Sequence, residues 1–197
     1  MNILFGSSLI VSMSGEAAGV RNVLMQDMRS LESLGHQGTL FDPWTPLCAD
    51  KYDLLHLYSA TLWTYPLGLF AKRKALKLVL TPIIDKIIPP FAVRIANAVV
   101  DRVPRLHTHM AAAKALCDMA DMVVAWSDSQ RDYFVRCFGL DKQKTMIVPY
   151  GLDTAAYHPD PTAFVDSYAP ADKFVLTVGH FGNRRKNYLR LIRVVGS

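Results

Sequence analysis

The sequence predicts an α/β protein with a Rossmann-like, doubly wound parallel sheet that continues into a second, similar domain. Short apolar runs, typical of parallel strands buried on both faces, alternate with segments of helical periodicity. The first run, residues 2–9, leads through a small-residue loop, residues 15–19, into an amphipathic segment. After Gly151 the alternation gives way to a proline-containing stretch. These observations define the fold class and a boundary within the chain.

Six strands are expected before that boundary, at residues 2–9, 38–41, 53–58, 76–81, 122–126 and 145–148. Between the first two, apolar residues recur at helical spacing from Val20 to Leu34, and Gly35 is expected to end that helix. Ser127 is expected to cap a helix that Gly139 closes. Residues 89–119 are expected to be mostly helical, with an interruption at Pro104.

The domain organisation follows from the same pattern. We expect a first domain over residues 1–150, a linker over 151–172, and the first strand (174–178) and helix (from Asn187) of a second domain over 173–197. One strand and one helix cannot bury a core, so we expect the second domain to be truncated. The apolar segment 174–178 should then pair with another chain, pack irregularly or lack order.

Composition limits the classes of partner. A net charge of +5 and a pI near 9.2 fit a phosphate-bearing ligand, an anionic membrane surface or nucleic acid. No basic face interleaved with aromatic residues accompanies this charge, so no nucleic acid is expected. Three scattered cysteines without a CxxC pair favour a reducing, cytoplasmic compartment. No apolar run approaches the roughly 20 residues of a membrane-spanning helix.

Two glycine-containing loops are candidate anion sites. Gly15 and Gly19 bracket the loop before the first helix, where free backbone N–H groups favour an anion. The spacing is GxxxG rather than GxGxxG, which disfavours a dinucleotide-dependent oxidoreductase. Gly179 follows a predicted strand, and three consecutive cations, residues 184–186, precede the last helix. That arrangement suits a diphosphate. A ligand-free connection and a solvated basic turn remain the alternatives for the two loops.

Several segments resemble the retaining, GT-B-fold glycosyltransferases of the family 4 type. The specific ones are VPYGLD at 148–153 with YHP at 157–159, which resemble that family's interdomain crossover, and residues 174–195, which resemble the opening of its donor domain. Weaker matches are AG at 18–19 with GH at 35–36, DLLH at 53–56, and AD at 120–121 with VVAWS at 123–127. Together the matches cover nearly the whole chain.

The resemblance implies an acceptor-side first domain and a second domain that binds a nucleotide-diphosphate sugar. It assigns the donor diphosphate to Gly179, Arg185 and Lys186. The glycine loop and the resemblance together indicate an acceptor or phosphate loop at Gly15, Gly19 and His56. It implies a sugar or lipid-linked acceptor, no metal and no cofactor. His180 stands where the family has arginine, Pro82 stands where it has a histidine near the reacting sugar, and no catalytic residue is assigned. On a buried strand, His56 is equally explained as a core histidine.

Three alternatives remain open. The chain as it stands is either an inactive part of a glycosyltransferase or a non-catalytic, truncated binding or interaction module. His107 and His109 form an HxH pair, which without nearby acids or cysteines is a weak metal site. Peripheral contact with the inner face of a membrane is suggested by cations next to apolar residues, and a solvated helix face is the alternative. These residues are Lys72, Arg73, Lys74 and Lys77, with Leu67, Leu69 and Phe70.

Overall fold

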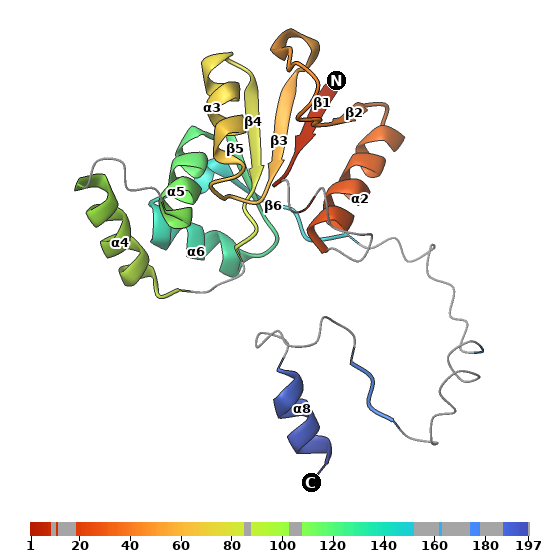
Figure 1. Ribbon diagram of the computed structural model, residues 1–197, viewed down its shortest axis with the longest axis vertical. Coiled ribbons are helices and arrows are strands. Elements are labelled where there is room, and N and C mark those ends of the chain that lie inside the picture. Colours follow the sequence, from red (N-terminus) through yellow and green to blue (C-terminus); the bar gives the residue numbers. More distant parts are fainter. Residues whose placement is uncertain are drawn as a thin grey trace. The chain divides into compact units, whose positions relative to one another are not determined.

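A computed structural model of the chain describes residues 1–8, 11, 19–84, 88–102, 108–151, 162, 174–177 and 187–196 (Figure 1). The chain divides into two compact units, Met1–Gly151 and Leu152–Ser197, and each is described by itself. Most of the predicted linker, residues 152–161 and 163–172, lies outside the described residues.

The first unit is built on a parallel sheet with the strand order β2-β1-β3-β4-β5-β6 (Figure 1). Every neighbouring pair of strands is parallel. The strands are β1 (Asn2–Gly6), β2 (Gln37–Leu40), β3 (Leu54–Tyr58), β4 (Lys77–Thr81), β5 (Met122–Ala125) and β6 (Thr145–Ile147). Each of the six strands predicted before residue 151 is present, and the doubly wound α/β fold is confirmed.

Helices cover the two faces of the sheet unequally in the described residues (Figure 1). On one face, α2 packs over Ile3, Phe5 and Tyr58. On the other face, α3, α5 and α6 enclose a larger core that contains Leu55 and Leu57, and α4 lies against α5 and α6. The helices are α2 (Gly19–Ser33), α3 (Tyr65–Arg73), α4 (Pro90–Arg102), α5 (His109–Met119) and α6 (Asp128–Phe138).

The helix ends follow their expected signals. The Ser127 hydroxyl accepts a hydrogen bond from the Gln130 N–H at 3.2 Å, so it caps α6 as predicted. Gly139 ends α6 with a φ of +70°, a left-handed conformation that glycine adopts without steric cost. Thr108 caps α5 in the same way as Ser127 caps α6.

Two expectations need correction or restriction. The predicted strand at 174–178 is not found at residues 174–177, which have no regular secondary structure. A β-strand needs a neighbouring strand to accept and donate its ladder hydrogen bonds, and the described part of the second unit otherwise contains a helix, α8 (Tyr188–Val195). The helical stretch 89–119 is present as α4 and α5, while Pro104 lies outside the described residues.

The connections place a topological switch point between β1 and β3. From β1 the chain passes through α2 to β2 on one side, and it then crosses to β3 on the other side of β1. In open parallel sheets, ligands bind at the carboxyl ends of the strands that flank such a point. Ser7 follows β1 and Ser59 follows β3, so both border the expected binding edge, and Thr81 ends the neighbouring strand β4 at the same edge.

Candidate functional site at the carboxyl edge of the sheet

The described residues include two of the six predicted site positions. His56 lies in the middle of β3, and Gly19 is the first residue of α2, where it is exposed. Gly15, Gly179, Arg185 and Lys186 lie outside the described residues, as do His180 and His107. The structure therefore describes two of the acceptor-side residues, while the donor-side prediction rests on the sequence.

His56 belongs to a continuous line of polar side chains beneath α2. Its Nε2 lies 2.9 Å from Thr81 Oγ1, and its Nδ1 lies 3.3 Å from the hydroxyl oxygen of Tyr58. The Tyr58 hydroxyl in turn donates to Asp27 Oδ2 at 2.7 Å. The line joins the carboxyl end of β4, the middle and end of β3, and α2. We call these four residues the polar relay.

One protonation pattern satisfies every member of the polar relay. Because Tyr58 uses its proton on Asp27, its oxygen is left to accept from Nδ1–H of His56. The Nε2 atom is then unprotonated and accepts the hydroxyl proton of Thr81. The donors thus run from Thr81 through His56 and Tyr58 to Asp27, and the tautomer of His56 follows from this pattern.

Burial sets the electrostatics of the polar relay. It lowers the pKa of His56 from 6.5 to about 4, so the imidazole is neutral at pH 7. Burial also raises the pKa of Asp27, although the hydrogen bond from Tyr58 lowers it in part. Burial raises the pKa of Tyr58 as well. An imidazole with a pKa of about 4 is a weak base at neutral pH. At neutral pH His56 is therefore an uncharged hydrogen-bonding partner of Thr81 and Tyr58.

Hydroxyl groups also fix the backbone where β1 and β3 end. Ser59 follows β3 with a φ of +75°, a conformation that costs free energy in a residue other than glycine. Its N–H donates to the Thr81 carbonyl at 3.0 Å, and its carbonyl accepts from the fully buried Thr64 hydroxyl at 3.0 Å. Ser7 Oγ donates to the Tyr58 carbonyl at 3.1 Å. Strain held in this way marks the strand end as a candidate site.

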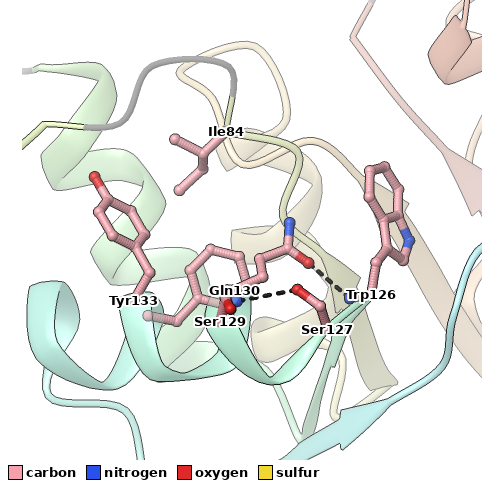
Figure 2. Close-up of a pocket in the computed structure, with 7 residues that line it drawn as sticks. Ile84, Trp126, Ser127, Ser129, Gln130 and Tyr133 are labelled. Atoms are coloured by element: carbon pink, nitrogen blue, oxygen red, sulfur yellow. Dashed lines mark hydrogen bonds between the residues drawn. The ribbon is translucent and has the colours of Figure 1, made fainter.

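A cavity of about 410 Å³ opens farther along the same edge, at the carboxyl end of β5 (Figure 2). We call it the carboxyl-edge cavity. Figure 2 shows Ile84, Trp126 and Tyr133 around it, with Ser127, Ser129 and Gln130 at the start of α6. Gln130 Oε1 accepts the Trp126 N–H at 2.7 Å, which locks the turn between β5 and α6. The cavity thus combines apolar walls with a few oriented polar groups, as ligand sites do.

Trp126 links the carboxyl-edge cavity to the face beneath α2. It lines the cavity and also packs at the margin of the apolar cluster that contains Tyr58. Its ring centroid lies 6.3 Å from that of Tyr150, whose hydroxyl is 3.4 Å from Gln26 Oε1 on α2. Sequence reasoning placed Trp126 at the end of a strand but did not identify the cavity. The signal for it was the N-cap Ser127 immediately after an apolar run.

The predicted apolar and basic patch is only partly a surface. Lys72, Arg73 and Lys74 are exposed, and Lys77 is exposed with its Nζ 3.6 Å from Asp121 Oδ1. Leu67 is buried and Phe70 packs against the core, so these two apolar residues face inward, while Leu69 is partly exposed. In the described part of the chain, no helix combines the length and apolar character needed to cross a bilayer.

No metal site emerges from the described residues, because no three histidine, cysteine or acidic side chains among them lie close enough to share an ion. His109 is exposed at the start of α5, while His107 lies outside the described range. The free thiols of Cys117 and Cys137 are buried, and burial raises the pKa of Cys117 to about 12. This holds that thiol in its neutral, unreactive form at pH 7.

Comparisons with known proteins identify no family for this chain. No protein-family model matches the chain, and no curated protein matches it. Among solved structures, the chain is similar to Anabaena Alr3699/HepE in complex with UDP, with 18% sequence identity and a TM-score of 0.48. The match covers 86% of this chain and 49% of that chain, so this chain spans about half the length of the HepE structure.

Proposed function

We propose that this chain supplies the acceptor-side domain of a GT-B, family 4-type glycosyltransferase. The enzyme transfers a sugar from a nucleotide-diphosphate donor to an acceptor with retention of configuration. The observation that carries the proposal is the carboxyl-edge cavity, which lies at the end of β5 on the same carboxyl edge of the sheet as the switch point between β1 and β3. The motifs around residues 148–159 and 174–195, which resemble this family, support it independently.

The lining of the carboxyl-edge cavity suits a hydroxylated acceptor. The Trp126 ring offers an apolar face, and Ser129 and Gln130 offer hydrogen-bonding groups beside it. No charged side chain belongs to the described lining of this cavity, which favours a neutral sugar moiety over an anion. We therefore propose a sugar or a lipid-linked sugar as the acceptor.

The donor would be held by residues from the second unit. Gly179 allows close approach of the backbone to a diphosphate, and Arg185 and Lys186 add charge that stabilises the leaving nucleotide. Lys186 directly precedes Asn187, the N-cap residue of α8. In this proposal the polar relay has a positioning role, because it fixes Thr81 and the adjacent strand end.

We further propose a cytoplasmic enzyme in peripheral contact with a membrane. Exposed apolar side chains recur every fourth residue on α4, at Phe91, Ile95 and Val99, and Arg94 and Arg102 lie on the same helix. Helices of this composition bind at anionic lipid interfaces. A lipid-linked acceptor would make such contact useful.

Acceptor binding can be tested with Trp126 as the reporter. The chain has three tryptophans, and Trp44 and Trp63 are 91% and 61% exposed, so a Trp44→Phe, Trp63→Phe variant leaves Trp126 as the sole indole at little cost in stability. A saturable change in its emission on addition of a glycoside or a short-chain prenyl-diphosphate sugar is expected.

Transfer is tested on this chain and on any longer protein that carries it, with a panel of nucleotide-diphosphate sugars and the acceptors that bind. The expected product is a glycoside with the anomeric configuration of the donor. Binding without transfer would favour the non-catalytic binding module. The proposal is refuted if no acceptor binds and no sugar is transferred across the panels.

A further inference from the structure

A second pocket, of about 400 Å³, lies between α4, α5 and α6. We call it the α4–α6 pocket. Three cations line it, each from a different helix: Arg94 of α4, Lys114 of α5 and Arg136 of α6. No carboxylate belongs to its described lining. Neither the sequence motifs nor the carboxyl edge of the sheet accounts for this pocket.

Asn97 places an unpaired, buried amide in the lining of the α4–α6 pocket. The residue lines the pocket and is 5% exposed, and neither its Nδ2 nor its Oδ1 makes a hydrogen bond with any described residue. Buried amides in folded proteins are almost always paired, because an unpaired one loses its hydrogen bonds to water without replacement. The donor and the acceptor of Asn97 are therefore both unpaired, and because both atoms are covered, a ligand reaches them when the side chains lining the pocket move aside.

The cations around Asn97 favour an anion. Lys114 Nζ lies 2.6 Å from Asp118 Oδ2, so part of its charge is compensated. Arg94 and Arg136 are exposed and form no ion pair within the described residues. Guanidinium groups donate two parallel hydrogen bonds to phosphate or carboxylate oxygens. The pocket thus offers two guanidinium groups without an ion-pair partner among the described residues, and one buried amide.

We propose that the α4–α6 pocket binds a phosphomonoester group. Its anionic oxygens accept hydrogen bonds from Arg94, Arg136 and Asn97 Nδ2. Its P–OH, or a neighbouring alcohol, donates to Asn97 Oδ1, which a fully ionised sulfate cannot do. The group is carried either by a free metabolite or by a lipid headgroup. This inference does not depend on the proposed glycosyl transfer.

Binding is measured on the whole chain by NMR, through the side-chain amide resonances of Asn97, and by calorimetry. The probes are inorganic phosphate, glycerol 3-phosphate and sulfate near pH 6.5. Phosphate and glycerol 3-phosphate are expected to shift the Asn97 resonances saturably, with sulfate weaker by roughly ten-fold because one hydrogen bond is lost. Vesicles of phosphatidylcholine with and without phosphatidic acid form the lipid arm.

Matched variants separate a built site from general attraction to positive charge. Asn97→Leu is expected to abolish binding while keeping or raising stability, since it removes two unpaired polar atoms. Arg94→Gln and Arg136→Gln are each expected to weaken binding by roughly ten-fold. Arg29→Gln, which removes an exposed cation from α2 outside the pocket, should leave binding unchanged.

The outcomes are distinct. Asn97-dependent binding of glycerol 3-phosphate identifies a free metabolite as the source, and Asn97-dependent binding of phosphatidic acid vesicles alone identifies a lipid headgroup. The proposal is overturned if no probe binds, if Asn97→Leu binds as well as the native chain, or if Arg29→Gln weakens binding as much as Arg94→Gln does.

Discussion

Tyr58 donates its hydroxyl proton to Asp27 over 2.7 Å, and this hydrogen bond joins α2 to β3 within an otherwise apolar interface. The same oxygen faces His56 Nδ1, so one hydroxyl group serves a carboxyl group and an imidazole together. The interface under α2 is therefore held by a directed chain of donors as well as by apolar packing.

Replacing Tyr58 by phenylalanine tests this interface. The variant keeps the ring but leaves the Asp27 carboxyl group and His56 Nδ1 without their partner. We expect the free energy of unfolding to fall by about 1–3 kcal/mol, measured by urea denaturation. Tyr65→Phe is the matched control, because the hydroxyl of Tyr65 makes no hydrogen bond with a described residue. Equal losses in the two variants would contradict the role of the Tyr58 hydroxyl.

His56 should make stability depend on pH. Its pKa is about 4 in the folded chain, against 6.5 for an unperturbed histidine, so between these values the unfolded chain binds more protons. Its contribution is complete above pH 6.5 and is lost as the pH falls towards 4. Two and a half pH units correspond to an upper limit of roughly 3 kcal/mol.

The raised pKa of Asp27 acts in the opposite direction at the acidic end of this range, because the folded chain then holds the extra proton. The His56 contribution is therefore taken as the difference between the pH profiles of the native chain and a His56→Gln variant. A difference that does not change between pH 4 and 6.5 would argue against a buried, neutral imidazole.

Filling the carboxyl-edge cavity should block acceptor binding. Ser129 is exposed and lines the cavity, so Ser129→Phe places a ring in the opening. Because the position is exposed, we expect the free energy of unfolding to change by no more than about 0.5 kcal/mol. We expect the fluorescence response of Trp126 to acceptors to disappear. Ser30→Phe, at an exposed position on α2, is the control and should leave that response intact.

Gly68 should not tolerate a methyl group. It is buried on α3, and a Cβ there would overlap Leu116 Cδ2 of the fully buried Leu116 on α5. Overpacking costs about 1–3 kcal/mol, while alanine gains about 1 kcal/mol over glycine in a helix. We expect a net loss near 1 kcal/mol, or a melting temperature lower by about 2–4 °C. Gly19→Ala, with open space around it, should not lower it.

The sequence predicts the sheet well because its strands are short apolar runs that need no distant information to be recognised. Periodicity also places His56 and Tyr58 on one face of β3. It cannot reveal that Asp27 lies opposite them, since that contact depends on how α2 crosses the sheet. The polar relay was therefore beyond sequence reasoning, although one of its members was singled out.

Two other differences have the same origin. Leu67 and Phe70 were grouped with their basic neighbours by proximity in sequence, but α3 turns them towards the core and leaves the cations outside. Residues 174–177 have the composition of a strand, yet composition does not supply a neighbouring strand. Burial and pairing are decided between elements, and a local pattern only shows what each element is able to do.

The helix α6 has a consequence that neither pocket shows alone. Ser129 and Tyr133, in its first half, line the carboxyl-edge cavity, and Arg136 and Phe138, near its end, line the α4–α6 pocket. A ligand that shifts this helix at one end alters the shape of the site at the other. By thermodynamic reciprocity, whatever factor an occupant of one site imposes on affinity at the second is returned unchanged. If α6 couples the two sites, the change in acceptor affinity caused by phosphate and the change in phosphate affinity caused by the acceptor measure the same coupling free energy.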